Sequence, residues 1–397
     1  MTASTVKYDP YDHLLDLDPY PTYKRLRDEY PLYYNDERDF YALSRFDDVR
    51  RASIDHATYA SGYGTVFEIM TGPEEFVQAI QSILWEDPPI HDVHRKIMTP
   101  AFGPRNILQM EPRIREYCAY FLDPLRDWPS FDFMKEFASK LPMMVIGQLL
   151  GVPDGEQGWL QHTTDTFIES QEGGAFNADV AAELFNYYQR LIEDRRSHPR
   201  DDMVSDLVAT EFVDDTGTRR HLDNRELLNF LLLLGAAGNE TVTRFLGWAA
   251  VVLADNPDSR AELVADTKLI PGAVEELLRY EPPSQVQGRR MMVDAEWYGQ
   301  MVPAGANILL MTAAAARDDR VYEDPDRFDI HRKGVPHLSL GKGLHLCIGA
   351  TLARLEARVA LEEILRRFPQ WSVRRDEAVM AHTSSVRGWA KLPIDIG

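Results

Sequence analysis

The sequence predicts a mainly α-helical protein with small β regions, folded as a single large domain over residues 1–397. Three observations lead to this prediction. Apolar residues recur at mixed spacings of three and four along most of the chain, strand-like runs are confined to two regions, and no repeat or low-complexity linker divides the sequence. Prolines and glycines stand at the ends of the helical segments, where helices commonly begin and end.

The individual elements follow from local periodicity and turn residues. Two apolar runs at 32–34 and 40–43 flank a polar stretch and predict a hairpin near the start of the chain. Further short strands, linked by turns, are predicted at 290–297, 300–303 and 306–311. Helices are predicted at 106–127, 135–151, 155–170, 178–196, 224–254, 257–281 and 349–368.

Charge and composition exclude several classes of protein. The chain has 43 basic and 63 acidic residues and a net charge of −20, which repels phosphates and anionic bilayers, so we expect no nucleic-acid partner. The longest apolar region, 230–254, is interrupted by polar residues and falls short of the ~20 apolar residues of a membrane span, so no membrane anchor is expected. With no signal-peptide pattern and only Cys118 and Cys347 as cysteines, the sequence predicts a cytoplasmic protein in which Cys118 is a buried apolar side chain.

Cys347 stands in a glycine-rich stretch from His337 to Gly349, directly before a predicted helix. Flanking glycines allow the backbone to approach something flat and bulky. A helix N-terminus favours thiolate over thiol, which is what a metal ligand requires. The alternative is a buried structural cysteine.

In this stretch the sequence resembles the cytochrome P450 family, whose cysteine loop reads Phe-x-x-Gly-x-x-x-Cys-x-Gly. Leu340, Gly343, Cys347 and Gly349 follow in the corresponding order, and His345 is also as in bacterial members. The resemblance implies the P450 fold and a haem b cofactor (iron protoporphyrin IX), with Cys347 as the axial ligand of the iron and Gly349 beside the haem. The departure is Leu340, where the family usually has Phe near the sulfur, and it bears on the redox potential.

Two further family motifs precede the cysteine in the family's order. Glu276-Leu-Leu-Arg279 fits the Glu-x-x-Arg pair, and Pro325-Asp-Arg327-Phe328 fits the element that joins it. A spacing of three places Glu276 and Arg279 on one face of a helix. The resemblance implies that Arg327 completes a structural triad that steadies the cysteine loop. Taken alone, such a pair is usually a solvated ion pair on a helix surface.

An acid and an alcohol lie in the longest apolar helix, within Ala237-Gly238-Asn239-Glu240-Thr241. A glycine weakens the helix there, and the Thr241 hydroxyl can bond a freed carbonyl, which leaves a kink or groove. The stretch matches the family's Ala-Gly-x-(Asp/Glu)-Thr. By resemblance, Thr241 binds dioxygen, Glu240 delivers protons and Ala237 lies against the haem. The alternative is a helix kink with Glu240 in a salt bridge.

The two propionates of haem require local cations in a chain of this net charge. The residues that match the family's haem contacts are His91, Arg95, Arg289 and His345. Each alone would ordinarily be a surface charge or a capped histidine. His94 lies one position off the pattern and is not included.

Family resemblance also places the substrate contacts in stretches that are rich in apolar side chains, which predicts an apolar small-molecule substrate. The pocket residues predicted in this way are Phe67, Met70, Phe167, Leu234, Ala237, Val286 and Val386. Each of them could instead belong to the core, and nothing in the sequence identifies the compound.

The resemblance therefore implies a soluble bacterial-type haem-thiolate monooxygenase, which uses dioxygen to oxidise an apolar small molecule. About fifty residues follow Cys347, too few for a fused reductase, so we expect a separate ferredoxin and ferredoxin reductase to supply electrons. An acidic ferredoxin requires a basic docking face, for which Lys96, Arg105 and Lys342 are candidates. Two alternatives stay open: a peroxygenase driven by hydrogen peroxide, and a non-catalytic haem protein that binds a ligand.

Overall fold

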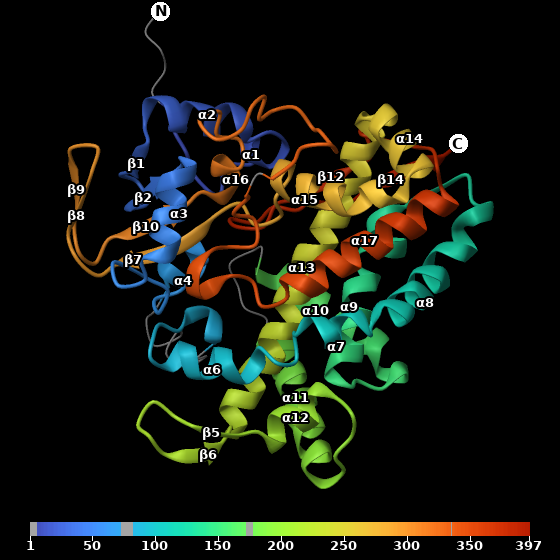
Figure 1. Cartoon of the computed structure of the whole chain (residues 1–397), viewed down its shortest axis with the longest axis horizontal. Coiled ribbons are helices and arrows are strands. Elements are labelled where there is room, and N and C mark those ends of the chain that lie inside the picture. Colours follow the sequence, from blue (N-terminus) through green and yellow to red (C-terminus); the bar gives the residue numbers. More distant parts are fainter. Residues whose placement is uncertain (1–5, 73–81, 172–177, 335) are drawn as a thin grey trace, which may run out of the picture.

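Helices form most of the chain and the strands gather into small sheets, as the sequence predicts (Figure 1). The computed structural model describes residues 6–72, 82–171, 178–334 and 336–397, without the side chains of residues 165, 167–171 and 178. In Figure 1 the largest sheet lies on the left with α2 and α3, and α8 and α17 lie on the right. The long helix α13 (Asn224–Asp255) runs between these two parts.

The bounds of the other helices are as follows. The first part of the chain holds α1 (Leu14–Leu17), α2 (Tyr20–Glu29), α3 (Phe46–Ile54), α4 (Phe67–Met70), α6 (Ile90–Met98), α7 (Pro104–Leu108) and α8 (Glu111–Leu122). The later helices are α9 (Lys140–Leu150), α10 (Asp154–Gln171), α11 (Ala178–Ser197), α12 (Met203–Ala209), α14 (Pro257–Ala265), α15 (Ile270–Tyr280), α16 (Thr312–Ala315) and α17 (Ala350–Arg367). Shorter helical turns are η1 (Ile83–Trp85), η2 (Asp123–Asp127), the π-helical η3 (Met134–Ala138), η4 (Thr267–Leu269) and η5 (Gly343–His345).

The largest sheet has five strands in the order β1-β2-β10-β7-β3. Its strands are β1 (Leu32–Asn35), β2 (Phe40–Leu43), β3 (Tyr59–Ala60), β7 (Gln287–Met291) and β10 (Asn307–Leu310). The predicted hairpin is confirmed, since β1 and β2 pair antiparallel with Leu32 opposite Leu43. The single strand predicted at 290–297 is wrong, because β7 ends at Met291 and a separate strand begins at Ala295.

The remaining strands are very short and pair in small groups. A three-stranded sheet has the order β11-β14-β4, with β4 (Ser130–Asp132), β11 (Trp371–Val373) and β14 (Pro393–Ile396). Three two-stranded pairs are β5 (Glu211–Val213) with β6 (Arg219–His221), β8 (Ala295–Trp297) with β9 (Gln300–Val302), and β12 (Val379–Met380) with β13 (Trp389–Lys391). Runs of two or three residues carry no periodicity, which is why most of these strands are not predicted from the sequence.

Three of the predicted helices are divided in the structure, and each has a proline inside the predicted range. Residues 257–281 form α14 and α15 with η4 between them, and Pro271 lies in the first turn of α15. Residues 106–127 divide in the same way, with Pro112 in the first turn of α8. A proline lacks the N–H that a helix interior needs, but it is tolerated in a first turn. The predicted helix 135–151 is divided between η3 and α9, whereas α10, α11, α13 and α17 confirm the others.

Helix α13 begins at a capping box and is buried along most of its length. The Asp223 side chain accepts a hydrogen bond from the Glu226 N–H over 2.8 Å, and the Glu226 carboxylate accepts one from the Asp223 N–H over 2.8 Å. The helix then packs against α9, α11, α15 and α17. Because these apolar partners cover α13 on several sides, the packing holds the helix, and therefore each of its side chains, in one position.

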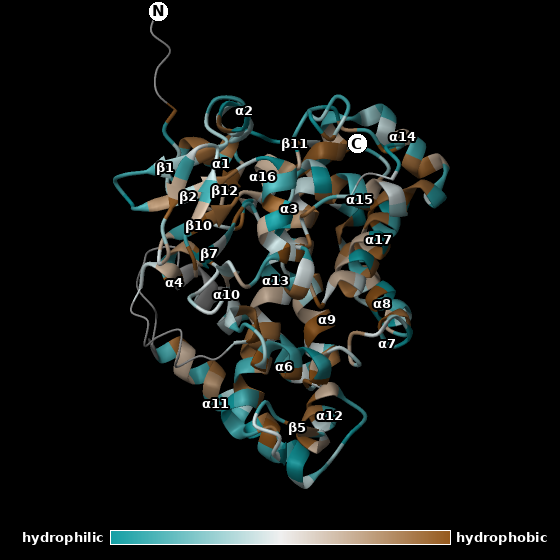
Figure 2. Cartoon of the chain, turned by 60° about the vertical axis from the view of Figure 1, so that its left-hand side comes forward, coloured by the Kyte–Doolittle hydropathy of each residue, from teal (hydrophilic) through white to brown (hydrophobic). Residues whose placement is uncertain are grey.

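Apolar side chains form one large cluster around α13 and two smaller ones at the five-stranded sheet. The two smaller clusters lie on opposite faces of the sheet, because Leu309 belongs to one and its neighbours Ile308 and Leu310 to the other. Figure 2 shows strongly apolar ribbon on α9 and hydrophilic ribbon on the peripheral α2 and α6. Cys118 is buried in the large cluster, as predicted. Across the described ranges, no helix combines the length and apolar character of a membrane span.

A buried ion network joins α6 to the first turn of α13. His94 Nδ1 lies 2.8 Å from Glu86 Oε2, and His94 Nε2 lies 3.3 Å from Glu226 Oε1. Glu226 also receives two 2.8 Å hydrogen bonds from Arg220. Burial of His94 works to lower its pKa, but the carboxylates of Glu226 and Glu86 outweigh it and raise the pKa to about 9.

This network predicts a pH dependence of stability. The raised pKa of His94 stabilises the folded protein fully below pH 6.5, and this contribution is lost as the pH rises toward 9. We expect His94→Gln to remove a slope of up to about 1.4 kcal/mol per pH unit from the free energy of unfolding in this range. Denaturant unfolding at several pH values measures the slope. His198→Gln, at an exposed histidine, is the control; an equal slope in His94→Gln and the unchanged protein would contradict the prediction.

Candidate active site

The segment from residue 337 to 349, here called the cysteine loop, is held in shape by its own backbone. The Cys347 N–H donates to the Leu340 carbonyl over 2.8 Å, and the Leu346 N–H donates to the Gly343 carbonyl over 3.2 Å. Gly341 and Gly343 have φ angles of +76° and +74°, which residues with a Cβ rarely adopt. Gly341 and Gly343 are therefore required by the conformation of the loop.

The cysteine loop packs closely on α3 before it enters α17. A Cβ at Gly343 would lie 2.7 Å from the Ser53 carbonyl oxygen, so this contact also requires glycine. The Ala350 N–H, at the first residue of α17, donates to the Cys347 carbonyl over 3.2 Å. The cysteine thus lies immediately before a helix N-terminus, as the sequence predicts.

The Cys347 side chain reaches the molecular surface, although the surrounding protein removes much of its water. This desolvation raises the pKa of the thiol, whereas the Gly349 N–H and the charges of Arg95 and Arg354 act in the opposite direction. A metal cation at the sulfur deprotonates a coordinating thiol. The arrangement therefore suits a sulfur that becomes a thiolate on binding a metal.

Four basic side chains, here called the basic cluster, converge beside the cysteine loop: His91, Arg95, Arg289 and His345. The rings of His91 and His345 have centroids 4.5 Å apart. Burial lowers the pKa of His345 to about 3, and the nearby charges of Arg289, His91 and Arg95 add to the effect. Arg95 Nη2 also donates to the Leu346 carbonyl over 2.7 Å. The structure brings together the four residues predicted to hold propionates, from α6, β7 and the cysteine loop.

The basic cluster is incompletely satisfied within the described residues. The Nε2 atoms of His91 and His345 are buried and have no hydrogen-bond partner there. Arg289 is only 5% exposed, and burial lowers its pKa to about 10. Buried cations and buried polar atoms are costly unless an anion meets them. The two propionates of haem are anions of this kind, so the residues fit the cofactor.

Glu276 and Arg279 form a buried ion pair on α15, as predicted. Glu276 Oε2 lies 2.7 Å from Arg279 Nε, and both side chains are 2% exposed. The third member of the triad is Arg332, whose Nε donates to Glu276 Oε1 over 3.2 Å. The prediction of Arg327 is wrong: its side chain is 65% exposed and pairs with Asp329, and its backbone carbonyl accepts a hydrogen bond from Arg279 instead. The motif residue contributes its main chain, and the chain then turns to bring a later arginine back to Glu276.

Helix α15 also holds the segments on both sides of Cys347. His337 Nε2 lies 3.0 Å from Glu275 Oε2, and the Ser339 hydroxyl donates to the Leu278 carbonyl over 2.5 Å. Beyond the cysteine, Arg354 Nε donates to Glu275 Oε1 over 2.6 Å. One helix therefore supports both the entry to and the exit from the cysteine loop.

The acid and the alcohol of α13 are adjacent on an unbroken helix. The Thr241 hydroxyl donates to the Ala237 carbonyl over 2.9 Å, as the sequence predicts. Gly238 allows α9 to approach, because a Cβ there would lie 2.7 Å from Ile146 Cδ1. Ala237 is exposed on the same part of the helix.

Glu240 forms an ion pair with Arg244 one helical turn later, with Glu240 Oε1 3.5 Å from Arg244 Nη2. Arg244 Nη1 donates in addition to the Trp389 carbonyl over 2.6 Å. Burial raises the pKa of the Glu240 carboxyl, and Arg244 opposes this rise. The salt bridge considered as the alternative is present, and the raised pKa also suits proton exchange. Sequence reasoning missed Arg244, although its spacing of four from Glu240 indicates the pair.

Three of the predicted pocket residues are packed within the core at the sheet. Phe67, Met70 and Val286 are buried in the same apolar cluster. A Cβ at Gly288 would lie 1.9 Å from the Met70 sulfur, so α4 rests directly on β7. These contacts favour the alternative that the three residues belong to the core.

The other predicted pocket residues lie in different surroundings. Leu234 is buried in the cluster around α13. Ala237 is exposed, and Val386 is half-buried beside its backbone bridge to Ser284. Phe167 lies in α10, but its side chain is outside the described residues.

The surface next to the cysteine loop carries a groove and exposed basic residues. The groove is lined by His91, Asp92, Arg95, Lys96, Thr99, Pro100, Gly103 and Leu344. Lys96, Arg105 and Lys342 are all exposed. Positive charge thus reaches the surface beside the buried basic cluster, despite the acidic balance of the whole chain.

The chain is similar to cytochromes P450 over nearly its whole length. The family model described as cytochrome P450 matches residues 176–386. The protein called cytochrome P450 123 in Mycobacterium tuberculosis is 40% identical over 393 residues, 98% of this chain and 96% of that protein. Cytochrome P450 monooxygenase PikC of Streptomyces venezuelae is 35% identical over 384 residues, 95% of this chain and 91% of that protein. The structure of cytochrome P450 CYP109Q5 from Chondromyces apiculatus is 33% identical, covers 98% of both chains and has a TM-score of 0.89.

The position of Cys347, the basic cluster and the fold define a haem-binding protein of the P450 type. The chain belongs to the cytochrome P450 family, in its bacterial form. It is accordingly a P450 monooxygenase, an oxidoreductase whose cofactor is the haem of iron protoporphyrin IX.

The corrected triad predicts different effects for its two arginines. Arg332→Ala leaves Glu276 with a buried charge that is only partly paired, so we expect the free energy of unfolding to fall by about 2–4 kcal/mol. Arg327→Ala removes an exposed ion pair and should change it by less than about 0.5 kcal/mol. Denaturant midpoints, followed by circular dichroism and by haem absorption, measure both. Equal losses in the two variants would refute the assignment of Arg332.

Proposed function

We propose that this chain inserts one atom of dioxygen into an apolar small molecule, with haem held by Cys347 and with electrons from a separate ferredoxin and ferredoxin reductase. The observation that carries the proposal is the position of Cys347, at the start of α17 and beside the basic cluster. The P450 monooxygenase class supports it.

Haem, when bound, supplies an iron centre at which dioxygen is activated with electrons from outside, while the thiolate donates electron density to the iron. Cys347 provides that sulfur, and the Gly349 N–H with Arg95 and Arg354 stabilises its negative charge. The basic cluster would hold the two propionates by charge and hydrogen bonding, and so would keep the cofactor next to the cysteine loop. Ala237, exposed on α13, offers a small side chain that lets a flat group approach the helix.

Thr241 and Glu240 handle protons in this proposal. The Thr241 hydroxyl donates its hydrogen to Ala237, so the lone pairs of Oγ1 remain available to accept a hydrogen bond. We expect Oγ1 to hold a water molecule where dioxygen binds. Glu240 has a raised pKa and lies next to it on α13, which suits a carboxyl that takes up and releases a proton during turnover. Arg244 sets the direction in which that carboxyl rests.

Glu240 and Thr241 also distinguish this proposal from the two alternatives, a peroxide-driven peroxygenase and a non-catalytic haem protein. A reaction driven by hydrogen peroxide receives its protons with the oxidant, and a non-catalytic ligand-binding protein needs none. Burial of the Glu240 carboxyl costs folding free energy, and its 3.5 Å ion pair with Arg244 offsets only part of that cost, because the pKa of the carboxyl is still raised. The pair therefore favours the use of dioxygen and delivered protons.

The predicted pocket residues bear on the substrate, and the exposed lysines bear on the electron donor. Ala237 on α13 and Val386 are the predicted pocket residues that the core leaves accessible, so they suit an apolar substrate best, whereas Leu234 is buried in the cluster around α13. The exposed Lys96 and Lys342 provide positive charge for an acidic ferredoxin. We propose that residues 1–397 form one domain, because β1, β2 and β3 share a sheet with β7 and β10, and α13 packs on helices from α9 to α17. We also propose that the protein acts in the cytoplasm.

The first test concerns proton handling. Thr241→Ala should divert a several-fold larger share of reducing equivalents into hydrogen peroxide at the expense of product, because the accepting hydroxyl is lost. Consumption of reductant, peroxide and product are measured together, with a substrate chosen by its shift of the Soret band. Thr241→Ser keeps the hydroxyl and should retain most of the coupling. If Thr241→Ala turns over dioxygen with unchanged coupling, the proposed role of Thr241 is wrong.

The second test concerns the ferredoxin surface. Lys342→Glu should slow the first electron transfer several-fold at low salt and make its rate less sensitive to added salt, since an attractive charge becomes repulsive. Stopped-flow reduction with an acidic ferredoxin measures both effects. Lys391→Glu, at an exposed lysine on β13, carries the same change in net charge and should leave the rate close to that of the unchanged protein. Equal rates in the two variants would remove Lys342 from the docking surface.

A further inference from the structure

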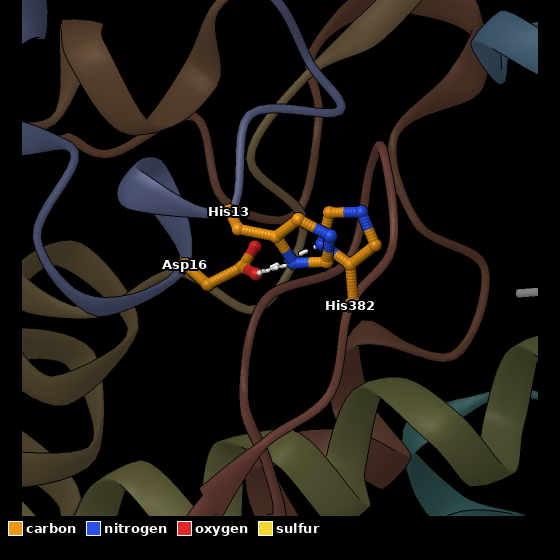
Figure 3. Close-up of side chains that lie close together, drawn as sticks. All are labelled: His13, Asp16 and His382. Atoms are coloured by element: carbon orange, nitrogen blue, oxygen red, sulfur yellow. Dashed lines mark hydrogen bonds and ion pairs between the residues drawn. The ribbon is translucent and has the colours of Figure 1, made fainter.

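A cluster of metal-binding side chains lies where a segment near the N-terminus meets a loop near the C-terminus. His13 and Asp16 belong to the N-terminal segment around α1, and His382 belongs to the loop between β12 and β13 (Figure 3). Asp16 Oδ2 lies 3.3 Å from His13 Nδ1 and 2.8 Å from His382 Nδ1. One carboxylate oxygen therefore contacts two imidazoles that are more than 360 residues apart in the sequence.

The chemistry of these three groups suits a divalent transition metal. Each residue offers one ligand atom, and the three atoms lie within 4.8 Å of one another. Zn²⁺ is bound by histidine nitrogen and carboxylate oxygen in tetrahedral sites, with water able to take a fourth position. We propose that His13, Asp16 and His382 form a zinc site that joins the N-terminal segment to the C-terminal loop.

The arrangement of the rings is compatible with this proposal after a small rotation. The two imidazoles are stacked, with centroids 3.6 Å apart and planes inclined by 22°. Stacked rings must tilt apart for both nitrogens to point at one ion. His13 is 77% exposed, so its ring can turn without displacing other parts of the protein. Asp16 and His382 are more enclosed and supply the fixed part of the site.

Neighbouring groups hold the backbone of the site in place. Arg387 donates from Nε to the Asp16 carbonyl over 2.7 Å and from Nη2 to the Leu17 carbonyl over 2.6 Å. Its charge is balanced by Glu281, 2.6 Å from Nη1, so it repels a bound cation less than an unpaired arginine would. Partners that fix the first ligands of a metal commonly contribute to its affinity.

A bound zinc ion would link the segment around α1 to the loop between β12 and β13. It would add metal ligation to the contacts of Arg387 that already join residues 13–17 to the loop at 382–387. Ligand binding to the folded state alone stabilises that state. We therefore expect zinc to raise the melting temperature of the haem-loaded protein. This inference does not depend on the proposed substrate or electron donor.

The test measures zinc bound to the haem-loaded protein by equilibrium dialysis and elemental analysis, together with the melting temperature. The unchanged protein should bind one more equivalent of zinc than either His13→Ala or His382→Ala, and zinc should raise its melting temperature but not that of the variants. Asp16→Asn keeps the shape of the side chain but removes its charge, and it should weaken zinc binding at least about tenfold. His331→Ala is the matched control, because His331 and Glu262 form a surface pair 2.8 Å apart with only two ligands described there.

Two results would overturn the proposal. Equal zinc content in the unchanged protein, His13→Ala and His382→Ala would show that Asp16 serves only as a hydrogen-bond acceptor for the two rings. An equal loss in His331→Ala would show that zinc binds surface histidines without selection. His13→Ala is expected to fold normally because its side chain is exposed, so a loss of zinc in that variant reports on the site itself.

Discussion

The buried ion pair of Glu276 and Arg279 is the interaction on which the cysteine loop depends. Arg279 donates to the carbonyls of Ala316 and Pro325, and Glu276 accepts from the Asp329 N–H. These bonds attach the long irregular segment after α16 to α15. Since α15 also holds the cysteine loop on both sides, a single helix fixes the chain before, within and after the segment that presents the sulfur. A buried pair of this kind is strongly destabilising when one partner is removed, because the other charge remains buried.

The local charge near the cysteine loop is positive, opposite in sign to the net charge of the whole chain. A chain with a net charge of −20 concentrates two arginines and two histidines beside the cysteine loop. Burial keeps His345 neutral at ordinary pH, with a pKa of about 3, so this imidazole adds no positive charge to the cluster, whereas Arg95 and Arg289 do. The two arginines match the two propionates of haem in number, and the imidazoles can add hydrogen bonds.

Much of the site follows from the sequence because its signals are local. The turn glycines, Cys347 before a helix and the Thr241 bond to the Ala237 carbonyl are each set by residues a few positions apart. The third member of the triad and the contacts of the pocket residues are set by how distant segments meet. Arg327 and Arg332 stand five residues apart, and only the turn between them decides which side chain reaches Glu276. In the same way, helix periodicity predicts α13 and α17 well, but it does not reveal the divisions at Pro112 and Pro271 unless the prolines are given more weight than the apolar pattern.

The ion network at the start of α13 constrains the number of residues between Glu226 and Thr241. Glu226 anchors the first turn to His94 on α6, and α6 also carries His91 and Arg95 of the basic cluster. Thr241 lies about 22 Å farther along, at 1.5 Å per residue. The helix therefore sets a fixed distance between Thr241 and α6, the element that carries His91 and Arg95 of the basic cluster. Inserting a single residue between Glu226 and Thr241 would turn the acid and the alcohol by about 100° around the helix axis, so the number of residues in this stretch is constrained as tightly as their identity.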